Sequence, residues 1–265
     1  MASHRLAVKL SSWIAAGLLI GGAGWATAQG ASSTASIASG KKGIGLAESS
    51  GLGAVQLTAL QVAWFYNWGA RTRVEHPAAF VPMAFSPKRL AEVPDQQAVV
   101  LGFNEPDNTS QANVSPEQAA AAWPALRSKA QRVVSPALAK NPLSSGNWLS
   151  SFWALGASTD FVAVHWYKGA DPQKFIRDIQ AICQSTGQKI WVTEFAPQTA
   201  AQARLEPEKF SQSQVDRFIK ETTTWMAQSS CVQRYAWHDA KMGTSALWNQ
   251  GQLTATGLTY AAVPP

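Results

Sequence analysis

The stretch VVLGFNEPDNTS, residues 99–110, contains an apolar run that ends on two polar side chains. The run Val99–Phe103 is continuous rather than alternating, which is typical of a strand covered on both faces. Asn104 and Glu105 follow at once, and Pro106 then ends the extended segment. A carboxylate at the end of a buried strand is costly unless it is solvated or used in chemistry. Glu105 is therefore either a turn residue or one member of a catalytic pair whose partner lies elsewhere.

Seven further apolar runs have the same continuous character, and helices are predicted between several of them over 115–129, 171–187 and 211–228. Ser115 and Ser211 each precede a glutamine by three residues, which is the capping-box signature. Alternating buried strands and helices indicate a parallel sheet. Eight strands in one domain of this length predict an α/β fold, a single compact (β/α)8 TIM-type barrel with short early connections. The seven runs are Gly43–Ala47, Val62–Tyr66, Phe80–Phe85, Arg132–Pro136, Phe161–Trp166, Lys189–Thr193 and Arg234–Trp237.

The N-terminal segment has the pattern of a secretory signal peptide. Arg5 and Lys9 precede an apolar segment, residues 13–23, that is too short to span a bilayer, and Ala-Thr-Ala at 26–28 is a small-residue cleavage site. We therefore expect a secreted or periplasmic monomer with no membrane attachment once the signal is removed. The predicted division of the chain is a signal peptide (1–28), a flexible lead-in (29–40) and the catalytic barrel (41–265).

Charge, histidine and cysteine usage exclude several classes of function. Loss of the two basic signal residues would take the net charge from +6 to +4, which is too mild to predict nucleic-acid binding. The four histidines lack a metal-ligand spacing, so neither a metal nor another cofactor is expected. Cys183 and Cys231 form a disulfide in an exported chain, or else remain as buried free thiols. No glycine-rich phosphate motif follows a strand, which argues against dinucleotide binding.

A second carboxylate, Glu194, ends the seventh apolar run in the same way that Glu105 ends the fourth. In a (β/α)8 barrel the carboxyl ends of the strands face the active site. Retaining glycosidases use two carboxyl groups about 5–5.5 Å apart, one as nucleophile and the other as acid and base. The alternative is that the two residues are unrelated partners of salt bridges. Their matching positions favour the catalytic pair.

An ordered set of short motifs resembles glycoside hydrolase family 128 over roughly Lys41 to Tyr260. Members of that family are secreted endo-β-1,3-glucanases of a retaining clan with the acid on strand four and the nucleophile on strand seven. The Asn-Glu-Pro element alone is typical of the whole clan, whereas the ordered set is more specific. The motifs are WFYNW (64–68), VPMAF (81–85), LGFNEPD (101–107), VVSPA (133–137), HWY (165–167), WVTEF (191–195) and ALWNQGQLTATGLTY (246–260).

The resemblance assigns roles to the strand-end residues. It implies that Glu105 is the acid/base and Glu194 the nucleophile. Asn104 is similar to the clan's asparagine that hydrogen-bonds the sugar 2-hydroxyl, and Tyr167 to a tyrosine that holds the nucleophile. His165 is either part of the site wall or a core histidine satisfied by backbone.

The sugar platform is expected among four of the twelve tryptophans, because flat aromatic faces pack against pyranose rings. The alternative for each is that it fills the core. We expect Asn67 to bond a sugar hydroxyl. Asp107 is expected to cap a loop or line a subsite. Asn108 is expected to lie in an ordinary solvated loop, and the alternative is that it lines a subsite. The tryptophan candidates are Trp68, Trp166, Trp237 and Trp248.

These observations predict a retaining endo-β-1,3-glucanase that acts on laminarin-like or curdlan-like glucans. Two alternatives within the enzymes are another retaining β-glycanase and an exo-acting β-1,3-glucanase. A third alternative, suggested by the many tryptophans, is a glucan-binding protein without catalytic activity. The pair His238-Asp239 resembles a base and its orienting acid, but no nucleophilic serine in a strand-turn-helix elbow accompanies it.

Overall fold

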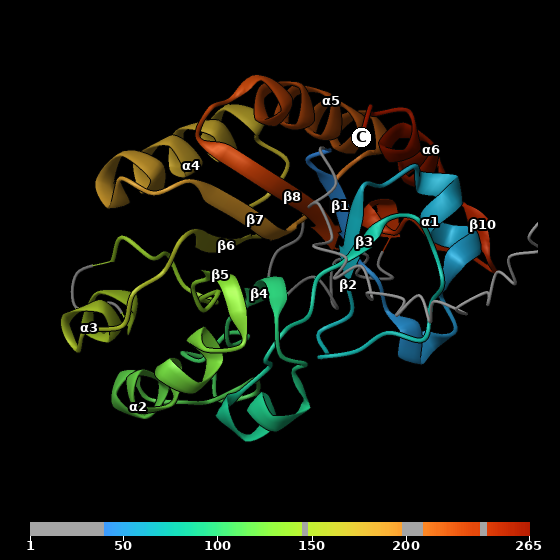
Figure 1. Ribbon diagram of the computed structural model, residues 1–265. Coiled ribbons are helices and arrows are strands. Elements are labelled where there is room, and N and C mark those ends of the chain that lie inside the picture. Colours follow the sequence, from blue (N-terminus) through green and yellow to red (C-terminus); the bar gives the residue numbers. More distant parts are fainter. Residues whose placement is uncertain (1–39, 145–147, 198–208, 239–242) are drawn as a thin grey trace, which may run out of the picture. The chain divides into compact units, whose positions relative to one another are not determined.

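Eight parallel strands form the frame of the part of the chain that the structure describes (Figure 1). This computed structural model describes residues 40–144, 148–197, 209–238 and 243–265. The predicted signal peptide, all but the last residue of the predicted lead-in, and Asp239 lie outside the described residues. Each predicted apolar run overlaps one strand. The strands are β1 (Lys42–Gly45), β2 (Trp64–Tyr66), β3 (Ala79–Phe80), β4 (Gln97–Leu101), β5 (Ala130–Val134), β6 (Val162–Trp166), β7 (Ile190–Phe195) and β8 (Val232–His238).

The order of the strands follows the order of the chain. One sheet runs β3-β2-β1-β8-β7-β6, and β4 and β5 pair separately. Single parallel bridges join Leu101 of β4 to Met83, three residues after β3, and Val134 of β5 to Phe161, the residue before β6. β3 is shorter than predicted, because Pro82 lacks the N–H that a continuing ladder requires. The result is an α/β fold with parallel strands, as the alternation of strands and helices predicts.

The three predicted helices are present with the predicted caps. Ser115 and Ser211 accept hydrogen bonds from the backbone N–H groups of Gln118 and Gln214. Three helices of seven residues each were not predicted, since they are too short to show a clear apolar period. α4 and α5 lie together and cover β7 and β8 (Figure 1). The helices are α1 (Ala54–Leu60), α2 (Pro116–Arg127), α3 (Trp148–Ala154), α4 (Pro172–Thr186), α5 (Gln212–Gln228) and α6 (Ala255–Ala261).

Shorter elements complete the described chain. Among them are three turns of 3-10 helix and an antiparallel hairpin that precedes α6. None of the helices within the described residues combines the length and apolarity needed to cross a membrane. All described residues belong to one compact unit, residues 35–265. The 3-10 turns are η1 (Glu48–Ser50), η2 (Pro87–Glu92) and η4 (Gly243–Ser245), and the hairpin strands are β9 (Trp248–Asn249) and β10 (Gln252–Leu253).

Side chains of the strands alternate between two apolar clusters. On the helix-covered face, residues such as Phe65 and Val192 join the core that includes the helices. On the strand-lined face, residues such as Tyr66 and Trp191 pack against side chains from other strands and the segments that follow them. Successive residues of a strand point to opposite faces, so this parity decides which strand-end side chains can meet in a common site.

A disulfide joins Cys183, late in α4, to Cys231, the residue before β8. The cross-link ties α4 to the start of β8, with β7 and α5 between them along the chain. A disulfide restricts the unfolded chain and so stabilises the fold, typically by about 2–4 kcal/mol. The alternative of two free thiols is therefore not what the structure contains.

Candidate active site

The two predicted carboxylates meet at the carboxyl ends of the strands, where Glu105 follows β4 and Glu194 lies near the end of β7. An oxygen of each and the Nδ1 atom of His165 lie within 4.8 Å of one another. His165 Nδ1 is 3.0 Å from Glu105 Oε1 and 3.4 Å from Glu194 Oε2. Inverting glycosidases separate their carboxyl groups by about 6.5–9.5 Å, and retaining ones by about 5–5.5 Å. The short separation fits double displacement.

A β-bulge turns Glu194 into the site. Val192 and Phe195 both pack on the helix-covered face although they are three residues apart, so strict alternation fails between them. The register between β7 and β8 shifts over the same interval. A bulge inserts one residue and re-aims a side chain, and such bulges are frequent next to active sites. Glu194 consequently reaches Tyr66, which lies on the strand-lined face.

Three hydroxyl or indole donors surround the Glu194 carboxylate. The indole N–H of Trp68 donates to Oε1 at 2.7 Å, and the Tyr167 hydroxyl donates to Oε2. The Tyr66 hydroxyl lies 3.2 Å from Oε1 and also 3.0 Å from the carbonyl oxygen of Thr193. Hydrogen bonds to a carboxylate favour its ionised form and fix its orientation. Tyr167 thus makes the contact that the family resemblance implied.

The charges around Glu194 also favour the carboxylate. Burial raises the pKa of Glu194, but His165, His238 and the hydrogen bonds from Tyr167 and Trp68 outweigh it and hold that pKa below its usual value. His238 contributes from β8, with Nε2 at 3.9 Å from Oε2. Glu194 is accordingly ionised at neutral pH, which is the state that a nucleophile requires.

Glu105 is held by fewer groups than Glu194. Asn108 Nδ2 donates to Oε2 at 2.9 Å, while Oε1 faces His165. The backbone at Glu105 has a φ of 42°, in the left-handed region that non-glycine residues rarely occupy. Its N–H donates to the carbonyl oxygen of Ala137 at 2.8 Å, which fixes this conformation. Strained residues of this kind cluster at functional sites.

His165 bridges the two carboxylates and is almost completely buried, with 1% of its side chain exposed. Burial lowers the pKa of His165, but the charges of Glu194 and Glu105 raise it by more, so the net shift is upward. Its Nδ1 faces both carboxylates, and its Nε2 is buried without a hydrogen-bond partner among the described residues. The structure therefore places His165 in the site wall and not in a core position satisfied by backbone.

The predicted contact with sugar is wrong for two of the four tryptophans. Trp166 and Trp237 are 1% and 0% exposed and belong to the core of the helix-covered face, where Trp166 stacks on Phe218. The physical reason is strand parity: His165 faces the site, so the next residue must face the helices. Likewise, Trp237 precedes His238, which contacts Glu194. Both tryptophans stabilise the packing of the strands against the helices.

Two other predicted binding residues have different surroundings from those expected. The Asn67 amide donates to Glu48 Oε1 and to the carbonyl oxygen of Arg71, each at 2.8 Å, and accepts from the N–H of Gly69. Its polar atoms are therefore used within the loop. Trp248 is half-buried in β9 and packs against the core of the helix-covered face, and its contact with sugar stays a prediction.

Trp68 and Asn104 remain at the site. Trp68 is partly exposed and donates directly to Glu194. Asn104 is 3% exposed, donates to Gln111 at 3.2 Å, and has an Oδ1 atom that is buried without a hydrogen-bond partner among the described residues. Asp107 caps a neighbouring loop, as one reading of the sequence expected, by accepting from the N–H groups of Ala139 and Lys140.

Three residues that contact the carboxylates are not among the predicted site residues. Tyr66 and His238 both satisfy strand parity, because Tyr66 lies two residues after Trp64 and His238 two residues after Ala236, and both earlier residues are on the strand-lined face. That signal was present in the sequence. Asn108 was assigned to a solvated loop, but the turn closed by its N–H on the Glu105 carbonyl brings it back to that carboxylate.

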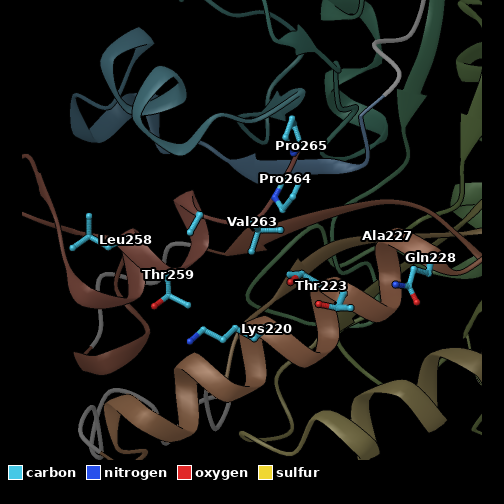
Figure 2. A pocket seen from close by; sticks show the side chains of 11 residues that line it. Lys220, Thr223, Ala227, Gln228, Leu258, Thr259, Val263, Pro264 and Pro265 are labelled. Carbon is cyan, nitrogen blue, oxygen red and sulfur yellow. The ribbon is translucent and has the colours of Figure 1, made fainter.

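The donor atoms of Glu105, His165 and Glu194 are also close enough together to be candidate metal ligands within the described part of the chain. Double displacement by a pair of carboxyl groups requires no metal or cofactor. A separate cavity of approximately 620 Å³ is lined by α5, α6 and the C-terminal residues (Figure 2). Its lining includes Lys220, Thr259 and Pro265, so it is distinct from the carboxylate site.

Comparison with known proteins identifies the class to which this fold and site belong. Residues 43–260 match the family model described as the glycosyl hydrolase catalytic core. The chain therefore belongs to the glycosyl hydrolase catalytic core family and is a glycoside hydrolase.

Solved structures confirm the more specific resemblance to glycoside hydrolase family 128. A variant of a family 128 (subgroup I) endo-β-1,3-glucanase from Amycolatopsis mediterranei, in complex with laminaripentaose, is 28% identical with a TM-score of 0.72, over 84% of this chain and 99% of that one. A curdlan-specific exo-β-1,3-glucanase of family 128 (subgroup III) from Blastomyces gilchristii, in complex with glucose, is 28% identical with a TM-score of 0.64, over 86% and 100%.

A curated relative extends the likeness to a longer protein. Alkali-sensitive linkage protein 1 of Schizosaccharomyces pombe is 28% identical over 195 residues, which is 66% of this chain and 34% of the relative. The chain thus spans about a third of the length of the curated relative that it matches.

Proposed function

We propose that the protein hydrolyses internal bonds of β-1,3-glucan with retention of configuration. Glu194 is the proposed nucleophile and Glu105 the proposed acid/base. The observation that carries the proposal is the pair of carboxylates, whose nearest oxygens lie within 4.8 Å across His165. The relatives that bind laminaripentaose or act on curdlan support β-1,3-glucan as the substrate.

In the first step Glu194 attacks the anomeric carbon and the bond to the leaving oxygen breaks. Glu105 gives its proton to that oxygen, so the leaving sugar departs as a neutral alcohol. In the second step Glu105 takes a proton from water while the water oxygen attacks the same carbon. The bond to Glu194 breaks, its carboxylate is regenerated and Glu105 is protonated again. Atoms and charges balance over the two steps.

The contacts of Glu194 suit both steps. Trp68, Tyr66 and Tyr167 keep the carboxylate oriented before attack, and they stabilise it again when it departs from the sugar. The negative charge of Glu194 disappears while the sugar is attached. Its loss favours the ionised form of the neighbouring Glu105, which is the form that acts as base in the second step.

The same proposal includes closure of the strands into a (β/α)8 barrel. β1 pairs with both β2 and β8, and the bridges Met83–Leu101 and Val134–Phe161 link β4 and β5 to their neighbours. A closed ring places the strand ends around one site. Trp68 and Asn104 are the proposed sugar contacts, because the Trp68 indole contacts Glu194 and Asn104 directly precedes Glu105, with an Oδ1 atom that has no hydrogen-bond partner among the described residues. The predicted signal peptide fits a glucan encountered outside the cytoplasm.

The test is a substrate panel with product analysis. We expect release of reducing ends from laminarin and curdlan and none from β-1,4-linked glucan or xylan. Internal cleavage gives a ladder of oligosaccharides, whereas glucose or a single short product from one end would instead support an exo-acting enzyme like the relative from Blastomyces gilchristii. Cleavage of β-1,4 chains in preference would overturn the proposed substrate. Tight binding of glucan without turnover would identify a non-catalytic binding protein.

A further inference from the structure

The loop after β2 presents Trp68 to Glu194 in an unusual backbone conformation. Trp68 has a φ of 59°, in the left-handed region. A bulky residue there is held only where its surroundings over-determine the conformation. Its indole N–H makes a bond of 2.7 Å to Glu194 Oε1. What holds this loop therefore determines how the indole meets the carboxylate.

Glu48 holds the loop through side-chain hydrogen bonds. It follows β1, in η1, and its Oε1 accepts from Asn67 Nδ2 at 2.8 Å and from the Thr72 hydroxyl. Its Oε2 lies 3.4 Å from the backbone nitrogen of Arg73. Asn67 precedes Trp68 directly, and its own Oδ1 accepts from the N–H of Gly69 at 2.9 Å. The carboxylate of Glu48 thus fixes both sides of the indole-bearing residue.

The end of β1 also provides the space for the indole. A Cβ atom added to Gly45 would lie 2.8 Å from the indole Cη2 of Trp68 and 3.2 Å from the hydroxyl oxygen of Tyr66. The first distance is shorter than packed carbon atoms allow, so any larger residue at position 45 would displace the indole. Gly45 and Glu48 therefore act on the same side chain, one by close approach and the other through the loop.

We infer that Glu48 is a positioning residue that acts through Asn67 and Thr72 to hold the Trp68 indole N–H on Glu194. This inference rests on the proposed function for its catalytic meaning. A donor fixed in advance stabilises the carboxylate without reorganisation during the reaction. Removing the support leaves Trp68 present but no longer aligned. Removal of the Glu48 carboxylate should therefore lower activity by the same factor as removal of the indole N–H itself.

The experiment compares Glu48→Ala with Trp68→Phe, which removes the N–H and keeps an aromatic ring. Glu48→Gln is the rescue variant, since its amide oxygen can still accept from Asn67 and Thr72. Glu221→Ala is the control, because Glu221 is a surface carboxylate paired with Arg217 on α5. Activity is measured as kcat, KM and a pH profile on laminarin. The Trp68 indole proton is followed by NMR as a function of pH, which requires no turnover.

We expect Glu48→Ala and Trp68→Phe each to lower kcat about tenfold, as for loss of a hydrogen bond to a charged group, with little change in KM. The acid limb of the profile should move to higher pH, because loss of a donor raises the pKa of Glu194. The double variant should be no worse than either single variant. Glu48→Gln and Glu221→Ala should resemble the parent protein. The titratable groups facing Glu194 in both variants are Tyr66, Glu105, His165, Tyr167 and His238.

In the parent protein the indole proton resonance should shift as Glu194 titrates, and in Glu48→Ala this response should be lost. An unchanged indole response and pH profile in Glu48→Ala would overturn the inference. If no glucan is cleaved but the indole response is present and disappears in Glu48→Ala, the positioning role holds and the proposed function fails. Should Glu48→Ala not fold, Asn67→Ala and Thr72→Val each remove one of the contacts through which Glu48 acts, and an unchanged indole response in both would overturn the inference.

Discussion

Glu105 and Glu194 carry the same functional group but are held in different ways. Glu194 lies within a strand, 6% of its side chain is exposed, and its partners come from β2, β6, β8 and the loop after β2. Glu105 follows a strand, 13% of its side chain is exposed, and one of its partners, Asn108, is only three residues further along the chain. His165 is the partner that both share.

The difference matches the work that each residue would do. A nucleophile must be ionised and fixed, which favours burial among several donors. An acid/base must lose and regain a proton in every cycle, which favours a more exposed position with fewer fixed donors. Two carboxylates with separate environments can therefore perform separate roles at one pH.

Removal of Glu194 should have the largest effect. Glu194→Ala leaves no group to form the covalent intermediate, so we expect kcat on laminarin to fall by roughly 10⁴-fold. Azide should restore part of the activity by occupying the space, and it should give a product of inverted configuration. Full activity in this variant would show that Glu194 is not the nucleophile. Glu221→Ala, which removes a surface carboxylate, is the control variant.

Removal of Glu105 should depend on the leaving group. In Glu105→Ala we expect a loss of about 10²–10⁴-fold on laminarin, because the leaving alcohol needs a proton. An aryl β-glucoside with an acidic leaving group should lose much less activity in its first step. Equal losses on both substrates would contradict the assignment of Glu105 as the proton donor.

Loss of a single donor to Glu194 should have a smaller effect. Tyr167→Phe removes the hydroxyl and leaves the ring, so kcat should fall by about 10- to 100-fold. The donors help to hold the pKa of Glu194 low, and the proposed nucleophile must be ionised to attack. Removing one donor raises that pKa, so activity should disappear at a higher pH on the acid side. A pH profile with an unmoved acid limb would show that the Tyr167 hydroxyl does not stabilise the carboxylate.

The smallest loss of activity is expected when a hydrogen-bond donor to Glu105, the more exposed carboxylate, is removed. Asn108→Ala removes one neutral donor from Glu105, and the freed oxygen can be solvated, so kcat should fall about fivefold or less. The acid limb set by Glu194 should remain where it is in the parent protein. A loss as large as that of Tyr167→Phe would show that Glu105 is as firmly fixed as Glu194.

The strands and the catalytic candidates were predictable because they leave local signals. Continuous apolar runs mark strands, and a carboxylate at the end of such a run is conspicuous against its cost of burial. Trp166 and Trp237 were assigned to the wrong face, although alternation from His165 and His238 contains the correct answer. Parity within each strand places Trp166 and Trp237 on the helix-covered face.

Other features depend on contacts that no local pattern contains. The bulge that directs Glu194 into the site shows in the pairing of β7 with β6 and β8, and the sequence of β7 alone does not indicate it. The contact of Glu48 with Asn67 joins the end of β1 to the loop after β2, and neither segment alone indicates it. The short helices α1, α3 and α6 have too few turns for a period to appear.

The most direct test of the paired carboxylates is the configuration of the newly formed reducing end, followed by proton NMR during hydrolysis of laminari-oligosaccharides. Double displacement at Glu194 predicts that the β-anomer appears first and that the α-anomer grows in later through mutarotation. Initial appearance of the α-anomer would mean a single displacement by water. That result would contradict the assignment of Glu194 as the nucleophile.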